Sequence, residues 1–358
     1  MRLGLVGLPN AGKSTLFNLI TGAGAEVGHY PFTTVDGSVG TVAVPDGRLE
    51  PLAAVLGSER AVPTTVSVVD IAGLVSGASE GEGLGNRFLG HIREVDAIAH
   101  VLRAFDRGDV VRAQGPLDPL GDADLVETEL ILADLQTVRR RLKDLHAEAK
   151  SATPEASTRL ACAHGLVEKL ESGAYLAREE LEPAESSLAD EMRLLTRLPV
   201  LYVLNTGELD AAGVERIAAE LEGRGARVIA FSAAFEGELE ELEPQERQAF
   251  LEDAGLTRSG RERFIREAHA LLGLITFFTG NERETRAWSL EEGNTAVEAA
   301  GIIHTDMARG FIRAEVVEAE ALIEIGSRSE ARRRGILRVE GRDYRVREGD
   351  VLQILFNA

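Results

Sequence analysis

The sequence has little cysteine and lacks any long apolar run. Cys162 is the only cysteine among 358 residues, which excludes an internal disulfide and a cysteine-rich metal site. We interpret its side chain as a small core residue rather than a catalytic thiol. No stretch of about 18 apolar residues occurs, and Pro9 interrupts the apolar run near the N-terminus, so we expect neither a membrane span nor a signal peptide. These absences predict a cytoplasmic protein.

Positive charge is also in short supply. The chain has 39 Lys and Arg residues against 59 Asp and Glu, a formal net charge of −20. This balance argues against a protein that coats nucleic acid through a generally basic surface, so we expect no DNA partner and only local contact with RNA. With 44% hydrophobic and 27% charged residues the chain is typical of globular proteins, and its length predicts two or three domains.

The strongest motif lies at the beginning of the chain. Residues 7–14 have the spacing G-x-x-x-x-G-K-S of a phosphate-binding loop, between an apolar strand-like run and a helix-like stretch. Gly7 and Gly12 permit the turns that point successive N–H groups inward, and the helix N-terminus adds the positive end of its dipole. We expect Lys13 to reach the β- and γ-phosphates, a catalytic role, and Ser14 to ligate Mg²⁺.

A second motif offers groups for the metal and the γ-phosphate. A β-branched run ends in Asp70, and Gly73 follows in the D-x-x-G arrangement of guanine-nucleotide-binding switches. We expect Asp70 to hold Mg²⁺ and the Gly73 N–H to contact the γ-phosphate, which makes Gly73 a catalytic candidate. Thr34 lies between the two motifs, where its hydroxyl can complete the metal's coordination only while the γ-phosphate is present.

The residues after Gly73 predict a mobile second switch. Five glycines lie from Gly73 to Gly85, too many for a helix or an inner strand. Switch NTPases of the Ras type place a Gln directly after D-x-x-G to orient the attacking water, but this chain has Leu74, which cannot form a hydrogen bond through its side chain. Slow intrinsic hydrolysis, or catalysis by another group, is therefore expected.

A third motif concerns the base of the nucleotide. After an apolar run at 201–204 the chain reads Asn205-Thr206-Gly207-Glu208, where GTPases usually carry N-K-x-D. The carboxylate of Glu208 is one methylene longer than the Asp that pairs with guanine, and Thr206 replaces the Lys that covers the ring. Guanine specificity is thus doubtful and adenine becomes a candidate. A further strand at 227–231 ends in Ser232 and Ala233, which match the loop that closes over the base.

Together these motifs resemble those of the YchF group of Obg-like ATPases. The resemblance covers nearly the whole chain and rests on residues 4–15, 30–34, 70–89, 205–208, 287–288, 301–306 and 310–315. It implies an Mg²⁺-dependent nucleoside triphosphatase that prefers ATP, with GTP possible, on a GTPase fold. It also implies ribosome binding, including the large subunit, with Ser14 and Thr34 as metal ligands and Thr206 against the base. The implied phosphate cradle comprises Asn10, Ala11, Gly12, Lys13, Ser14 and Thr15.

One position departs from the family pattern. Members of the family carry a His shortly after the fourth strand, proposed to help hydrolysis, whereas the matching stretch here contains Arg112. The pKa of an Arg side chain exceeds about 12, so it cannot act as a general base at neutral pH, but it can neutralise transition-state charge. Two interpretations of Arg112 stay open, an arginine finger supplied in cis and a solvated surface residue.

The motifs and the periodicity predict an α/β fold. We expect a P-loop NTPase with a Ras-like G domain, an inserted antiparallel helical hairpin and, by the resemblance, a C-terminal TGS domain of β-grasp shape. Leucine stripes at helical spacing on both sides of a break at 150–154 predict the hairpin. The expected boundaries are 1–124 and 195–273 for the G domain, 125–194 for the hairpin and 274–358 for the TGS domain.

The C-terminal region also has the most basic stretch. Residues 327–347 contain eight arginines against three acidic residues, a local excess of positive charge in an acidic protein. This stretch is either an ordinary solvated surface or the place where RNA makes contact, and the resemblance favours RNA.

Three functions are compatible with the sequence. The leading one is an ATP-preferring, Mg²⁺-dependent hydrolase that acts as a conformational switch on ribosomes. An alternative is a ribosome- or RNA-binding adaptor that holds nucleotide as a structural plug, which Leu74 and Arg112 make conceivable. A P-loop kinase is disfavoured, because the chain pairs the D-x-x-G motif with Asn205-x-x-Glu208.

Overall fold

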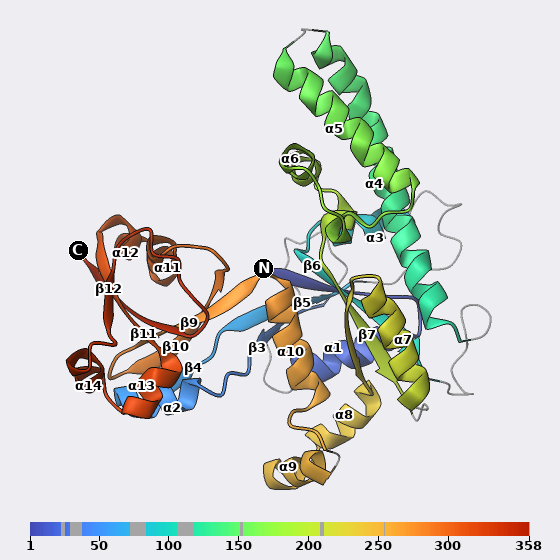
Figure 1. The fold of residues 1–358 in the computed structure, drawn as a ribbon. Coiled ribbons are helices and arrows are strands. Elements are labelled where there is room, and N and C mark those ends of the chain that lie inside the picture. The colour runs from blue at the N-terminus through green and yellow to red at the C-terminus, as the bar shows by residue number, and fades with distance from the viewer. Residues whose placement is uncertain are drawn as a thin grey trace. The chain divides into compact units, whose positions relative to one another are not determined.

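The computed structural model forms two compact units, made of residues 1–41 with 67–264 and of residues 42–66 with 265–358 (Figure 1). No helix in the described part of the chain is long and apolar enough to cross a membrane. The structure describes residues 1–22, 26–28, 38–71, 84–105, 117–150, 153–207, 211–253 and 255–357.

The first unit is built on a seven-stranded sheet in the order β2-β3-β5-β1-β6-β7-β8. Strand β1 runs parallel to β5 and β6, and the parallel pairing continues through β7 to β8, so the carboxyl ends of these strands meet at one edge. All eight residues of the central β6 are buried. The strands are β1 (Arg2–Val6), β2 (Glu26–Gly28), β3 (Val39–Ala43), β5 (Thr65–Asp70), β6 (Ala97–Ala104), β7 (Val200–Thr206) and β8 (Arg227–Phe231).

Helices cover this sheet. Apolar residues of α3 and α4 pack on β1 and β6, α4 and α7 pack beside β7, and α1 packs against α8. The helices are α1 (Lys13–Thr21), α3 (Leu84–Ile92), α4 (Pro119–Ala149), α5 (Pro154–Glu171), α6 (Pro183–Glu191), α7 (Ala211–Gly223), α8 (Ala233–Glu240), α9 (Pro244–Asp253) and α10 (Gly260–Leu271), with single 3₁₀ turns η2 (Leu176–Arg178) and η3 (Leu195–Arg197).

The predicted helical hairpin is confirmed by α4 and α5, which lie side by side in green (Figure 1). Each helix begins with a proline preceded by a side-chain cap: Asp118 accepts from the Gly121 N–H and Thr153 from the Ala156 N–H. The hairpin core contains Leu135, Val138, Leu145, Ala163, Leu166 and Leu170. Helix α4 begins at 119, six residues before the predicted start of the insert at 125, because the apolar contacts of its first turns belong to the sheet.

Polar contacts fix the base of the insert. The carboxylate of Asp134, 1% exposed, accepts from the backbone N–H groups of Leu195 and Thr196 at 2.8 Å and from the Thr196 hydroxyl at 2.7 Å. Burial raises the pKa of Asp134, and these hydrogen bonds oppose the shift. The guanidinium of Arg178 pairs with Glu127 at 2.8 Å and donates to the Tyr202 hydroxyl at 2.9 Å. The insert is therefore locked to η3 and β7 through saturated polar groups.

The second unit has a six-stranded mixed sheet in the order β12-β11-β13-β9-β10-β4. Apolar clusters lie on both of its faces, one against α11 and one against α2, α13 and α14. The elements are α2 (Leu49–Leu56), β4 (Arg60–Val62), β9 (Leu274–Gly280), β10 (Glu284–Glu291), α11 (Ala296–Ile303), α12 (Thr305–Arg309), β11 (Phe311–Glu318), α13 (Ala319–Ile325), α14 (Arg328–Arg333), β12 (Arg338–Glu340) and β13 (Asp350–Phe356).

Residues 42–66 belong to the second unit, whereas the predicted domain boundaries place them in the first. Those boundaries put them in the G domain, but α2 and β4 belong to the second unit. Leu49 and Leu52 pack with Phe278, Val317 and Leu322, and β4 extends the sheet by pairing with β10. The physical reason is the apolar face of α2, which is covered by a sheet whose other strands lie more than 200 residues away in the chain. The second unit also begins at 265 rather than at 274.

Candidate nucleotide-binding site

The loop between β1 and α1 needs glycine at two positions. Gly7 and Gly12 have φ values of 152° and 92°. A Cβ atom on Gly7 would lie 2.4 Å from the Val101 carbonyl oxygen, and one on Gly12 would lie 2.1 Å from Nδ2 of Asn205. Asn10 also has a positive φ of 64°, a conformation that Asn tolerates better than most residues. The loop is thus a tight backbone turn held against the middle of β6 and the end of β7.

Lys13 lies inside this loop. Its side chain is 9% exposed, and Nζ donates to the carbonyl oxygens of Gly7 at 2.9 Å and Leu8 at 3.1 Å. Burial lowers the pKa of Lys13, and the charge of Asp70 opposes the shift. The ammonium group therefore has carbonyl partners that an anionic phosphate can replace without leaving the charge unpaired.

Two oxygen ligands meet beside the loop. The Ser14 hydroxyl, in the first turn of α1, donates to Oδ2 of Asp70, at the end of β5, at 3.3 Å. A hydroxyl and a carboxylate are oxygen donors of the kind that Mg²⁺ prefers, so this pair fits that ion. No cluster of three His, Cys, Asp or Glu side chains suited to a metal occurs in the described part of the chain. The predicted ligand Thr34 lies outside the described residues.

Asn205 joins the phosphate loop to the base loop. Its side chain is 6% exposed, with Nδ2 donating to the Ala11 carbonyl at 3.0 Å and Oδ1 accepting from the Ala233 N–H at 3.1 Å. The strand register brings Asn205 to this position, because β7 ends beside β6 at the same edge of the sheet. Asn205 thus brings three predicted binding residues together, its own side chain included.

The rest of the predicted base site is partly described. Ser232 caps α8, its hydroxyl accepting from the Phe235 N–H at 3.2 Å, and Thr206 lies half-buried at the end of β7. The structure therefore places the following predicted residues at the carboxyl edge of the sheet, on its loops and on the adjoining ends of strands and helices: Asn10, Ala11, Gly12, Lys13, Ser14, Thr15, Asp70, Asn205, Thr206, Ser232 and Ala233. The predicted residues outside the described ranges are Thr34, Gly73, Arg112 and Glu208.

Two arginines that pack on elements of the site were not predicted, and of these Arg261 lies at the end of α1 away from the phosphate loop. Arg261, in α10, donates from its guanidinium to the carbonyls of Leu19 and Ile20 and so caps the end of α1. Arg103, at the end of β6 and 7% exposed, lies over the Phe105 ring at 4.8 Å. A Cβ on Gly207, in the segment that follows β7, would lie 2.9 Å from the Phe105 Cβ. For Arg261 no local sequence signal exists, since its partners lie about 240 residues away.

His100 does not join the site as an acid or base. It is 2% exposed in the middle of β6, and its ring centroid lies 5.4 Å from that of Tyr202. Burial, with the charges of Lys13 and Arg178, lowers the pKa of His100 to about 3. The imidazole is therefore neutral at physiological pH.

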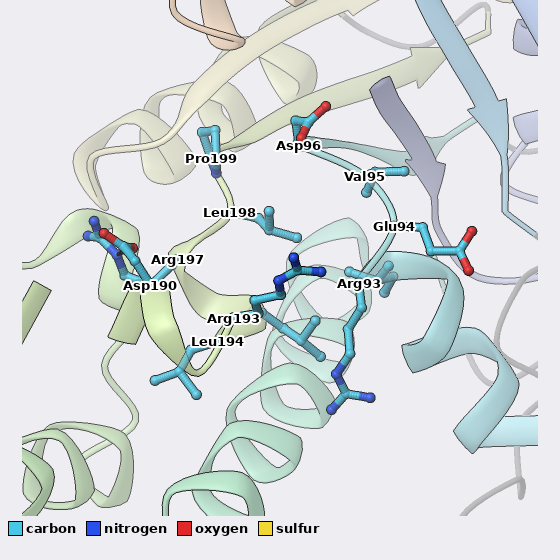
Figure 2. A pocket seen from close by; sticks show the side chains of 12 residues that line it. Arg93, Glu94, Val95, Asp96, Asp190, Arg193, Leu194, Arg197, Leu198 and Pro199 are labelled. Carbon is cyan, nitrogen blue, oxygen red and sulfur yellow. Dashed lines mark hydrogen bonds and ion pairs between the residues drawn. The ribbon is translucent and has the colours of Figure 1, made fainter. Parts of the chain in front are cut away.

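A separate cavity lies at the opposite, amino-terminal edge of the sheet. It has a volume of about 490 Å³ and is lined by the segments 92–96 and 190–199. Figure 2 shows Arg193 in its middle and Arg197 beside Asp190. Nε of Arg197 forms an ion pair with Oδ1 of Asp190 at 3.1 Å. Its described walls include no predicted site residue. The predicted nucleotide-binding residues therefore lie at the carboxyl edge and not in this cavity.

Two protein families match the chain. A family described as "50S ribosome-binding GTPase" matches residues 2–138. The family of the C-terminal part of YchF GTPases, described as a protein of unknown function, matches residues 274–357.

Full-length relatives agree with these matches. "Ribosome-binding ATPase YchF" of Bacillus subtilis is 45% identical, over 99% of this chain and 98% of the relative. The protein of the same name from Haemophilus influenzae is 44% identical, over 99% of both chains. The solved structure of the Schizosaccharomyces pombe YchF GTPase superposes with a TM-score of 0.86 at 31% identity, and it covers 99% of this chain and 97% of that one.

Proposed function

Because the chain belongs to the YchF family of P-loop nucleoside triphosphatases, we propose that it hydrolyses ATP in preference to GTP while associated with ribosomes. The observation that carries the proposal is the arrangement of Lys13 inside the glycine loop, with the Ser14 hydroxyl 3.3 Å from the Asp70 carboxylate. The names of the relatives support both ribosome binding and ATP as the substrate.

Each part of the phosphate site has a proposed role. The N–H groups of residues 10–15 bind the phosphate oxygens, and Lys13 pairs with the β- and γ-phosphates. Ser14, Asp70 and Thr34 would hold Mg²⁺, which when bound neutralises the charge that develops on the phosphates. Gly73 contacts the γ-phosphate through its N–H.

The proposed preference for adenine rests on Thr206 and Glu208, while Asn205 holds the loops. Its amide oxygen and nitrogen each form one hydrogen bond to the protein backbone, at 3.1 and 3.0 Å, so half of its four hydrogen-bonding positions hold the two loops together. Base discrimination therefore falls on Thr206 and Glu208, and these are the two residues that differ from the guanine-specific motif.

Hydrolysis is proposed to drive a switch. Thr34 and the segment after Gly73 tighten around the γ-phosphate and relax when it leaves. Leu74 cannot orient water, and Arg112 is proposed to neutralise transition-state charge instead. If Arg112→Ala leaves single-turnover hydrolysis unchanged, this role of Arg112 is wrong.

RNA contact is proposed for a smaller set of arginines than the sequence indicated. Arg332 pairs with Glu315 at 2.6 Å, and Arg333 and Arg334 share Glu330 at 2.7 Å, so two carboxylates offset two of these three positive charges. Arg342, Arg345 and Arg347 are exposed and form no ion pair with a described residue. We place the RNA contact on these three side chains, toward the large ribosomal subunit.

The decisive experiment titrates ATP and GTP separately with Mg²⁺ and measures phosphate release with and without ribosomes. We expect tighter binding of ATP and multiple-turnover release above that of Lys13→Ala. Binding of GTP at least tenfold tighter, about 1.4 kcal/mol, would overturn the ATP preference. Release no faster than that of Lys13→Ala would favour an adaptor that holds nucleotide as a plug.

A further inference from the structure

Helices α8 and α9 present an aromatic pair that the nucleotide site does not use. Phe235 on α8 is 37% exposed and Phe250 on α9 is 50% exposed, and their ring centroids lie 5.9 Å apart. Burying such a side chain is favourable relative to leaving it exposed to water. A joined pair of exposed rings is thus a candidate contact for another molecule.

The same two helices carry dense negative charge. Residues 236–253 contain eight acidic residues and one basic residue, a local charge of −7. Two of the acids have structural partners: Glu236 accepts from the Gly260 N–H, and Glu240 pairs with Arg247 at 3.2 Å. Glu238, Glu246 and Asp253 are exposed and form no ion pair within the described residues.

Helical spacing places these carboxylates around the rings. Glu238 follows Phe235 by three residues in α8, and Asp253 follows Phe250 by three residues in α9. Glu246 precedes Phe250 by four. Residues three and four apart lie on one face of a helix, so each ring is flanked by a free carboxylate on its own face. We call Phe235, Phe250, Glu238, Glu246 and Asp253 the acidic aromatic face.

Charge decides which partner fits this face. A solvated acidic surface would explain the carboxylates alone but not the paired rings. Nucleic acid is excluded, because seven net negative charges repel a phosphate backbone. We propose that the acidic aromatic face docks a basic protein segment that places an apolar side chain against Phe235 and Phe250 and its Lys or Arg residues against the carboxylates.

This inference rests on the proposed ribosome association and makes it more specific. On a ribosome the face contacts a basic ribosomal protein and not ribosomal RNA. Helix α8 begins at Ala233, whose N–H binds Asn205. The docked segment is therefore one helix turn from the base loop.

The first test is sedimentation of the full chain with purified 50S subunits. The double variant Phe235→Ser/Phe250→Ser should bind at least tenfold more weakly. The matched control Leu125→Ser/Leu132→Ser, which removes side chains 41% and 47% exposed on α4, should bind as the unmodified chain does. Equal loss in both double variants, or no loss in the aromatic one, overturns the proposal.

Charge reversal distinguishes a protein partner from an RNA partner, because it should weaken binding to a basic protein and strengthen binding to RNA. Glu238→Lys/Asp253→Lys should weaken binding to 50S subunits about tenfold, because added positive charge repels a basic protein. Lysines near the ends of α8 and α9 also suit the helix dipole, so folding is retained. The control Glu179→Lys/Glu180→Lys should not weaken binding. Tighter binding by Glu238→Lys/Asp253→Lys would mean that RNA faces these helices, and unchanged binding would also overturn the proposal.

A second probe separates failure of this inference from failure of the proposed function. Fluorescence anisotropy of a labelled 16-residue Lys–Leu peptide should show binding to the full chain, at least tenfold weaker in Phe235→Ser/Phe250→Ser. A Lys–Gly peptide of equal charge should bind more weakly than the Lys–Leu peptide. Phosphate release without ribosomes should be unchanged in every variant. If 50S binding is absent but peptide binding follows this pattern, ribosome association fails and the docking face stands; equal binding of both peptides overturns the face.

Discussion

The phosphate loop and the base of the helical insert both concentrate polar side chains, but they use them differently. At the base of the insert, Asp134 is buried with three hydrogen-bond donors around one carboxylate. In the phosphate loop, Lys13 binds carbonyls of its own loop, and Ser14 and Asp70 meet at 3.3 Å. Saturated groups hold elements together, whereas groups with exchangeable partners are available to a ligand. The comparison predicts that mutations in the first region change stability and mutations in the second change activity.

The largest effect is expected at Lys13. Lys13→Ala should lower multiple-turnover phosphate release by at least about 10³-fold, roughly 4 kcal/mol, because transition-state charge loses its fixed cation. The melting temperature should not fall, since a buried ammonium group is itself costly. Lys143→Ala, at an exposed lysine of α4, is the control. A melting temperature that fell with activity would show that Lys13 is structural and would break the comparison.

The next effect is expected at Asp134. Asp134→Ala leaves three buried donors without an acceptor and should lower the free energy of unfolding by about 3 kcal/mol, measured by urea denaturation. Phosphate release at a temperature where the variant is folded should stay close to that of the unmodified chain. Glu129→Ala in the same helix should change stability by less than about 0.5 kcal/mol. Full stability of Asp134→Ala would contradict the proposed lock.

Asn205 both holds two loops together and lies in the predicted nucleotide site, so its variant tests both sides of the comparison. Asn205→Ala removes the two hydrogen bonds that tie the phosphate loop to the base loop, so nucleotide affinity should fall about 30-fold, roughly 2 kcal/mol, in a titration with ATP. Asn18→Ala, at an exposed side chain of α1, should bind ATP normally. Normal affinity of Asn205→Ala would show that the two loops hold their positions without this bridge.

The smallest effect concerns His100 and pH. Its pKa in the folded chain is about 3, below the ordinary value of 6.5, so only the unfolded chain gains the proton as the pH falls between these values. Stability is fully present above pH 6.5 and should drop by about 1.4 kcal/mol between pH 7.5 and pH 5.5. His100→Leu should lose this part of the pH dependence, and His146→Ala, at an exposed histidine, should keep it. An unchanged slope in His100→Leu would show that another group titrates.

Elements defined by local pattern could be predicted from the sequence. The phosphate loop follows from glycine spacing, and β6 at 97–104 follows from a mainly apolar run that contains His100 and Arg103. The hairpin follows from leucines at helical spacing. The positions of Ser14 and Asp70 at one edge follow from the rule that parallel strands end together.

Features that depend on distant pairs could not be predicted. In the sequence Asp134 is indistinguishable from the other charged residues of a long helix, because its partners Leu195 and Thr196 lie about 60 residues away. Arg261 likewise reads as a solvated arginine. Residues 42–66 show no pattern that separates them from the G domain, since only the second sheet reveals what covers α2.

The path of residues 42–66 limits the positions at which the gene can be split between the two units. The chain leaves the first sheet after β3, contributes α2 and β4 to the second sheet, and returns as β5. A gene fragment that ends before residue 265 would encode Leu49 and Leu52 without the surface that covers them, and a fragment that begins there would encode a sheet without its edge strand. The two units therefore cannot be exchanged between proteins by recombination at a single junction.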